Sequence, residues 1–318
     1  MKKLLFCFSF VALLSSCDTK EVIINPIQKE IEISKNNERL IFSNQEEFNS
    51  TLNLLKNKTV EELQKWSKSK GIESLINVEL SDKYDNFNFP NVLKAIINVN
   101  GEYQIGNSIA WYDNGFKHFA QSEEELKYIK QNPSLNTEKA KVESKIVTKK
   151  SDSELQRVVL GSNTLDARHQ KTFFQNNNSG SERKYVHEVV CYTEYHNVTD
   201  SFFGSGYSSY SSVYVRVKLE FKTRGRWKPA GEKRNISYSL YGTYTLITDG
   251  VNVISGNFNQ NSGRYNASGD LQIPIQSFGQ GFSHTLPMWE LEVNGSIDHS
   301  VVGDVASNRW INSGLPLW

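Results

Sequence analysis

The sequence is poor in cysteine, proline and net charge, and each shortage excludes a class of protein. Seven prolines in 318 residues argue against a mucin-like stalk or a proline-rich spacer. A formal net charge of +1 excludes the basic face that a nucleic-acid partner requires. Of the three cysteines, Cys7 and Cys17 lie near the start, so Cys191 stands alone and no internal disulfide is expected. The stability of the folded chain must therefore come from its core.

Motifs of the common hydrolases and nucleotide enzymes are also missing. There is no Gly-x-Ser-x-Gly elbow and no glycine-rich phosphate loop. The run His187-Glu188-Val189-Val190-Cys191 lacks the second histidine of a zinc-protease helix and alternates like a strand. Carboxylates such as Glu290 and Glu292, or Asp298 beside His299, fit a solvated strand face better than a glycosidase pair. We therefore expect no catalytic residue, no metal and no cofactor, and predict that the protein is not an enzyme.

The one long apolar run lies at the start of the chain. Lys2 and Lys3 precede apolar residues 4–14, and Leu14-Ser15-Ser16-Cys17 follows. The run is shorter than the roughly 20 residues of a membrane-spanning helix and has the order of a cleaved signal. Its ending is typical of a lipobox, so residues 1–17 are predicted to be a lipoprotein signal and Cys17 the lipidated residue, with two or three acyl chains as a membrane anchor. The alternative is an ordinary secretory signal with an incidental cysteine.

After a tether at residues 18–33, residues 34–133 show helix and hairpin signals. Ser43 with Glu46 and Thr59 with Glu62 are capping-box pairs, each followed by an apolar stripe at helical spacing. Further signals are Pro90 as a first helical residue, the turn pair Asn100-Gly101, a hairpin turn at Asp113-Asn114-Gly115, and a capped helix from Ser122 to Asn132-Pro133. We predict a small α+β N-terminal domain.

Three stretches in this region carry a family resemblance: Glu46-Glu47-Phe48, the helix with Glu61-Glu62-Leu63 and Trp66, and residues 100–109. Together they resemble the N-terminal half of uncharacterised surface or periplasmic lipoproteins of Bacteroidota, over about residues 1–130. The resemblance implies a place in the bacterial cell envelope and supplies no catalytic residue. Asp18 favours the inner membrane under the enteric sorting rule, which need not hold in Bacteroidota. We expect the outer membrane, on its periplasmic face or at the cell surface.

The second half of the chain changes to a period of two. Residues 134–184 are polar and are predicted to be a linker. In residues 185–318, the segment 213–221 alternates apolar with charged or hydroxylated residues, which predicts a strand with one buried and one wet face. Further candidate strands cover 186–195, 236–247, 251–258, 265–275 and 289–301, with turns at Asp249-Gly250 and Asn261-Ser262-Gly263. This predicts an antiparallel β-sandwich, Ig-like or jelly-roll-like.

Aromatic residues in glycine- and serine-rich segments provide the one candidate ligand site. Tyr207, Tyr210 and Trp227 are expected on loops, where rings form binding platforms at low entropic cost. The alternative is that they fold inward and cap the core. The predicted function is a lipid-anchored envelope protein that binds a glycan or a protein. The alternatives are an assembly subunit that pairs by strand addition, or a secreted hydrolase with an unrecognised site.

Overall fold

Two β-sheets and a small group of helices form the described part of the chain. The computed structural model describes residues 34–36, 39–78, 84, 87–146, 156–158, 168–176, 180–267 and 269–318. Residues 33–318 form one compact unit. The predicted signal, Cys17 and the tether at 18–33 lie outside the described residues. The α+β class is confirmed, and no helix in the described ranges has the length and apolarity needed to span a membrane.

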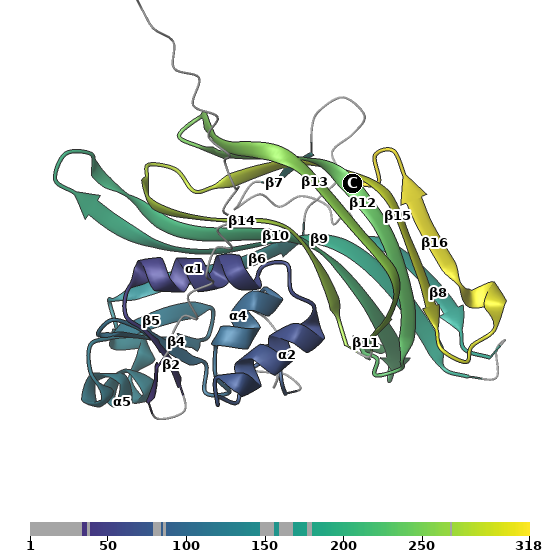
Figure 1. Ribbon diagram of the computed structural model, residues 1–318, viewed down its shortest axis with the longest axis horizontal. Helices are drawn as coiled ribbons and strands as arrows, with labels where there is room; N and C mark the ends of the chain where they lie inside the picture. The colour runs from purple at the N-terminus through teal and green to yellow at the C-terminus, as the bar shows by residue number, and fades with distance from the viewer. Residues whose placement is uncertain are drawn as a thin grey trace, which may run out of the picture. The chain divides into compact units, whose positions relative to one another are not determined.

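The elements follow one another from helices and hairpins to long strands (Figure 1). The helices are α1 (Gln45–Leu55), α2 (Val60–Ser69), α4 (Asn91–Ile96) and α5 (Glu123–Gln131), with 3₁₀ turns at Pro133–Leu135 and Ala306–Asn308. The shorter strands are β1 (Ser34–Asn36), β2 (Arg39–Phe42), β3 (Glu102–Ile105), β4 (Ser108–Asp113), β5 (Phe116–Ala120), β6 (Lys139–Ile146), β7 (Gln156–Val158), β8 (His169–Phe174), β11 (Arg226–Pro229) and β16 (Trp310–Gly314). The long strands are β9 (Glu182–Asp200), β10 (Gly204–Thr223), β12 (Arg234–Thr248), β13 (Val251–Ala267), β14 (Leu271–Ser283) and β15 (Met288–Val301).

Local capping chemistry explains where the helices begin. At α2 the Thr59 hydroxyl accepts from the Glu62 amide while the Glu62 carboxylate accepts from the Thr59 amide, which confirms the predicted capping box. At α1 the cap is one residue later than predicted, because the Asn44 side chain accepts from the Glu47 amide at 2.9 Å. The apolar stripe of α1 is buried as expected: Phe48, Leu52 and Leu55.

One mixed sheet joins the first half of the chain to the second. Its order is β1-β2-β3-β4-β5-β6-β9-β10-β11, with β8 also on β9 and β14 also on β10. Only β2 and β3 run parallel among these pairs. Gly106-Asn107 forms a turn that divides the predicted first hairpin strand into β3 and β4, and Gly106 adopts a φ of +55° there.

The segment predicted as a polar linker contains strands where it is described. β6 joins β5 on one side and β9 on the other, and β8 pairs with β9. In β6 the charged residues alternate with Ala140 and Val142, and both small apolar side chains are buried. Because β6 is rich in lysine and glutamate, its alternation of buried and exposed residues was not recognised from the sequence. The division into domains at 134–184 stays a prediction.

The second sheet covers one face of the first. Its order is β13-β12-β15-β16, and β7 pairs with β15. Valines of β9 and β10 pack against leucines, isoleucines and Trp289 of β12 and β15 to form one core between the sheets. Trp289 is fully buried and its Nε1 donates to Ser211 Oγ at 2.8 Å. The turn predicted at Asn261-Ser262-Gly263 is wrong, because these residues lie inside β13, where Asn261 and Ser262 pair with β12 and the register shifts directly after them.

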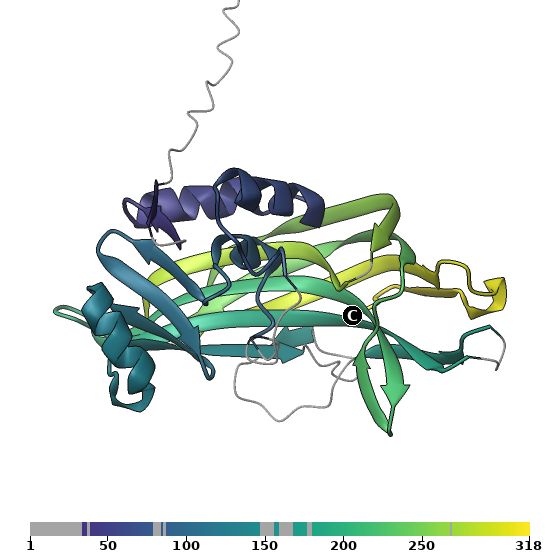
Figure 2. The same cartoon turned by 90° about the horizontal axis from the view of Figure 1, so that it is seen from below.

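Both faces of β10 are buried near its centre, whereas the alternation predicted one wet face. Val213, Val215 and Val217 face the second sheet as expected. Tyr214 and Arg216 point the other way but are also buried: Tyr214 belongs to the core that the helical part of the chain forms, and Arg216 donates to Glu188 and Asn88. Figure 2 shows the helices lying along one side of the long strands. The Tyr214 hydroxyl donates to the Asn88 carbonyl at 2.6 Å. The polar face of β10 is therefore covered by α1 and α4.

Candidate ligand-binding groove

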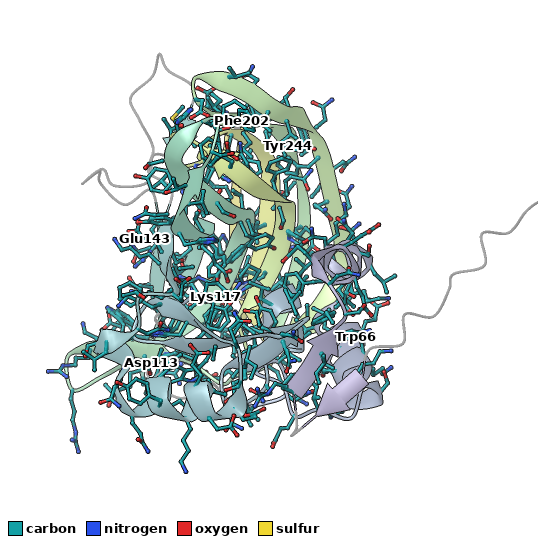
Figure 3. All side chains as sticks on the ribbon, turned by 90° about the vertical axis from the view of Figure 1, so that its left-hand side faces the viewer. Trp66, Asp113, Lys117, Glu143, Phe202 and Tyr244 are labelled. Atoms are coloured by element: carbon teal, nitrogen blue, oxygen red, sulfur yellow. The ribbon has the colours of Figure 1, made fainter. Side chains whose placement is uncertain are left out.

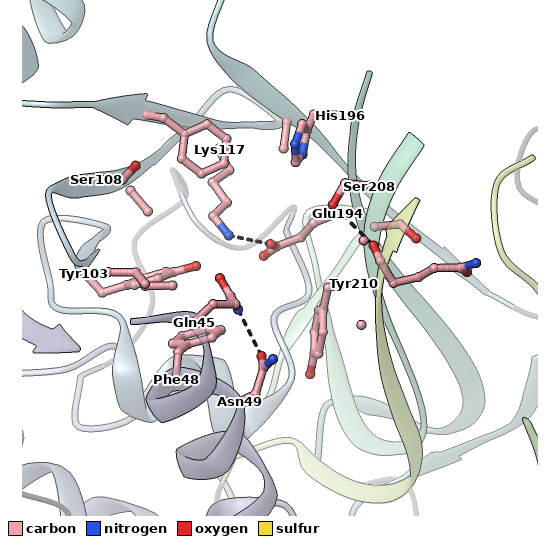
Figure 4. Close-up of a pocket in the computed structure, with 18 of the residues that line it drawn as sticks. Gln45, Phe48, Asn49, Tyr103, Ser108, Lys117, Glu194, His196, Ser208 and Tyr210 are labelled. Atoms are coloured by element: carbon pink, nitrogen blue, oxygen red, sulfur yellow. Dashed lines mark hydrogen bonds and ion pairs between the residues drawn. The ribbon is translucent and has the colours of Figure 1, made fainter. Parts of the chain in front are cut away.

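A cavity of about 390 Å³ lies where α1 and the β3–β5 strands meet β9, β10 and β14 (Figure 4). Phe48, Tyr103, Phe119 and Tyr210 contribute aromatic rings to its wall. Amide and hydroxyl side chains add polar groups: Gln45, Asn49, Ser108, Ser208, Ser209 and Gln280. An apolar cavity of this size with a few placed polar groups is the usual form of a small-ligand site. We call it the inner cavity.

A second cavity of about 290 Å³ lies beside the first and is called the outer cavity. Asn49, Tyr210 and Gly279 line both cavities. The remaining wall of the outer cavity comes from α1, from the start of α4 and from β10 and β14. The two cavities together form a groove between the helices and the sheet, and the Tyr210 side chain lies at their junction. The groove thus comprises the inner and the outer cavity.

A buried ion pair lies in the inner cavity. Lys117 Nζ on β5 is 2.9 Å from Glu194 Oε2 on β9, and their side chains are 12% and 7% exposed. The other carboxylate oxygen, Oε1, accepts hydrogen bonds from the Tyr112 and Tyr192 hydroxyls, each at 2.5 Å. Lys117 Nζ also lies 5.2 Å from the centre of the Tyr103 ring. This network fixes one cation and one anion side by side on the cavity wall.

The protonation states of these groups follow from burial and from the ion pair. Burial alone lowers the pKa of Lys117, but the Glu194 carboxylate and the Tyr103 hydroxyl more than reverse this effect and raise it. Burial, followed by the Glu194 charge, raises the pKa of Tyr112 and of Tyr192 well above the ordinary value. Burial, followed by the Lys117 charge, lowers the pKa of His196. At neutral pH the ammonium is charged, the tyrosines are protonated and the imidazole is neutral.

The Tyr103 hydroxyl is a further polar group of the inner cavity. The residue is 1% exposed, and its ring stacks on Phe48 at 5.1 Å between centroids. Its hydroxyl makes no hydrogen bond of good geometry within the described part of the chain, although the Lys117 ammonium and the Tyr112 hydroxyl lie near enough to lower its pKa against the larger raising effect of burial. A buried hydroxyl without a partner is costly, by about 1–3 kcal/mol, and such groups often serve a ligand.

The structure separates the three aromatic residues that the sequence proposed as one site. Tyr210 lines the groove, but Tyr207 lies on the other face of β10, where it packs against Tyr195. Trp227 lies on β11 opposite Lys222 of β10. Lys222 is twelve residues from Tyr210, or about 40 Å along the strand. Lys184 Nζ lies 4.4 Å from the centre of the Trp227 ring. Tyr207 and Tyr210 are strand residues rather than loop residues, so the predicted platform does not exist as one surface.

The exposed aromatic tip of the β9–β10 hairpin also lies outside the groove. Phe202 is 92% exposed, and Phe203 packs on Phe282 at 5.7 Å. In Figure 3 Phe202 lies toward one end of the view and Lys117 near its middle. The tip and the groove are separate features.

Lys117, Glu194 and Tyr103 were missed from the sequence. One signal was present: Glu194 is a carboxylate within the apolar strand predicted at 186–195, and a charge in such a strand is buried only with a partner. That partner, Lys117, lies 77 residues earlier in the chain. Among the described residues no group of three or more His, Cys, Asp or Glu side chains is placed to hold a metal ion.

Comparison with known proteins is limited to one structural similarity. No protein-family model and no curated protein matches the chain. The chain is similar to the crystal structure of a DUF4848 family protein from Bacteroides thetaiotaomicron, at 14% sequence identity and a TM-score of 0.21. That match covers 88% of this chain and 98% of the other.

Proposed function

We propose that this protein is a ligand-binding lipoprotein of the bacterial cell envelope and that its ligand lies in the groove. One observation carries the proposal. Two neighbouring cavities share Tyr210 in their walls, and the inner one contains a buried ion pair and a buried tyrosine hydroxyl that makes no hydrogen bond of good geometry. The anchor is lipid on Cys17, the partner is a glycan or a protein, and the outer membrane is the expected location. We retain an Ig-like or jelly-roll-like arrangement as the finer assignment for the two-sheet part.

The protonation states of the ion pair and the two tyrosines around it support a binding role for these groups. A general base must be unprotonated near neutral pH and within reach of the substrate. The raised pKa values of Lys117, Tyr112 and Tyr192 keep all three protonated. Glu194 already accepts three hydrogen bonds, and its charge is compensated by Lys117. The Lys117–Glu194 pair, fixed by these hydroxyls beside aromatic rings, is suited to holding a ligand, and His196 is the one imidazole among the described residues of the same wall.

The groove is tested by two substitutions on opposite faces of one strand. Tyr210→Ala should weaken binding of any ligand found in a screen of glycans and envelope proteins about 30-fold or more, the effect of removing an aromatic hot spot of about 2 kcal/mol. Tyr207→Ala, on the far face of β10, is the matched control and should leave the affinity unchanged. Isothermal titration measures both variants. If Tyr207→Ala weakens binding and Tyr210→Ala does not, the ligand site is not the groove.

The anchor makes a separate prediction. Cys17→Ala should abolish labelling by a radioactive fatty acid and move the protein from the detergent phase to the aqueous phase, because no acyl chain remains to hold it on a bilayer. Cys191→Ala is the control, since that thiol is buried in the core. Acyl labelling that persists in Cys17→Ala contradicts the proposal.

Assembly by strand addition is a second candidate, and one observation favours it. Within the described strands β13 pairs only with β12, so its other edge is open. Val251 and Val253 on this strand are exposed. If that edge recruits a second copy, Val251→Lys with Val253→Lys should convert an oligomer to a monomer in sedimentation analysis, because edge charges oppose pairing. A wild-type protein that is already monomeric excludes self-association through β13.

A further inference from the structure

The polar groups of the groove are mainly neutral hydroxyls and amides. In the inner cavity the charged side chains are Lys117 and Glu194, which neutralise each other, and His196 is uncharged at neutral pH. The outer cavity adds neutral groups from Asn49, Asn53, Asn91, Ser212, Gln272 and Ser277. Lys56 and Lys58 also line it at its rim after α1, where Lys56 is solvent-exposed and Lys58 is half-buried. Because exposed charges are screened by salt, the interior of the groove selects for hydrogen-bonding capacity rather than for charge.

We infer that the ligand is a neutral oligosaccharide of at least two sugar rings, which lies along both cavities across Tyr210. This inference rests on the proposed function of the groove. A pyranose ring has a face of C–H groups that packs on an aromatic ring, and hydroxyls at its rim that require donors and acceptors. Tyr210 is half-buried and borders both cavities, so one sugar on each side of it contacts the same side chain.

The ion pair matches two hydroxyls on adjacent carbons. A hydroxyl both donates and accepts, whereas an ammonium only donates and a carboxylate only accepts. Lys117 Nζ therefore donates to one hydroxyl of a vicinal diol, and Glu194 Oε2 accepts from the other. The Tyr112 and Tyr192 hydroxyls occupy Oε1 and hold the carboxylate in place. The Tyr103 hydroxyl, buried in the same wall, supplies a third hydrogen bond to the inner sugar.

The chemistry of the ligand is tested on the full-length protein in a detergent without a sugar headgroup. The probes are neutral di- to tetrasaccharides of gluco, galacto, manno and xylo configuration, with trigalacturonate and a hyaluronan tetrasaccharide as acidic counterparts. At least one neutral probe should bind, the acidic probes should bind at least tenfold more weakly, and periodate cleavage of the diols should abolish binding. No binding by any neutral probe, or preference for an acidic one, overturns the inference. A peptide or protein ligand that depends on Tyr210 overturns it too, but leaves the proposed function of the groove standing.

Tyr103→Phe separates ligand contact from folding. It removes one hydroxyl that makes no hydrogen bond of good geometry in the described structure, so the melting temperature should change little. Affinity for the neutral oligosaccharide should fall about fivefold, the effect of one lost hydrogen bond. Tyr238→Phe is the control, since Tyr238 packs against the core between the sheets and does not line the groove. A bound neutral sugar whose affinity is unaffected by both Tyr103→Phe and Tyr210→Ala lies elsewhere, which contradicts the inference and the proposed function together.

Discussion

Replacing Glu194 by alanine should lower the free energy of unfolding by about 3–5 kcal/mol, the usual cost of removing one partner of a buried ion pair. The Lys117 ammonium is 12% exposed and would lose its compensating charge. The hydroxyls of Tyr112 and Tyr192 would lose their acceptor at the same time. Urea denaturation followed by circular dichroism measures the loss.

Two comparison variants distinguish the buried pair from an ordinary surface pair. Glu182→Ala removes the partner of Lys222 in a pair whose side chains are 26% and 41% exposed, and should cost less than about 1 kcal/mol. Combining Lys117→Met with Glu194→Gln should be less damaging than Glu194→Gln alone, because no uncompensated charge remains. Equal losses for Glu182→Ala and Glu194→Ala contradict this description of the pair.

Acidification should destabilise the protein through two histidines between the sheets. His187 Nε2 and His299 Nδ1 are 3.1 Å apart, and both rings are fully buried. Burial lowers the pKa of each well below 6.5, and the nearby His169 and Arg234 act in the same direction on the pKa of His187. The unfolded chain then binds two protons that the folded chain does not. Stability is therefore present above pH 6.5 and is lost as the pH falls through it.

The measurement is the free energy of unfolding at several pH values for the wild type and for His187→Gln combined with His299→Gln. The double variant is expected to be less stable at pH 7.5 but to have a shallower slope between pH 6.5 and 5. Because the slope reports bound protons and not packing, it remains informative even if the variant is destabilised. His118 and His196 also have lowered pKa values, so some slope should persist. Identical slopes would show that the pair does not titrate on unfolding.

Local signals predicted the elements well, but long-range packing decided their roles. The Thr59 and Ser122 caps and the Asp113-Asn114-Gly115 hairpin depend on residues within one turn of each other, and all were predicted. The helix predicted to begin at Pro90 begins one residue later, at Asn91, with Pro90 as its N-cap. The roles of β6 and β10 depend on neighbours more than 40 residues away in sequence. The charged segment of β6 becomes a strand by pairing with β9, and the polar face of β10 is buried by the segment around Asn88. No window of the sequence contains that information.

The candidate site shows the same division. Tyr210 was singled out as an aromatic residue in a glycine- and serine-rich segment, and it does line the groove. Tyr207 was chosen by the same criterion, but strand alternation places it on the opposite face. The Lys117–Glu194 pair joins β5 to β9 across β6, a neighbourhood that exists only once the sheet order is known.

The central claim is that a neutral oligosaccharide binds in the groove, and amide hydrogen exchange locates a bound ligand without any substitution. Exchange is compared for the full-length protein with and without a saturating neutral oligosaccharide from the binding screen. The account predicts slower exchange in the bound state at the first turns of α1 and at Gly279–Gly281 of β14, which line the inner cavity. It predicts no change at the Phe202–Phe203 tip or along β11. Protection at the tip or around Trp227, with α1 and β14 unchanged, would contradict it.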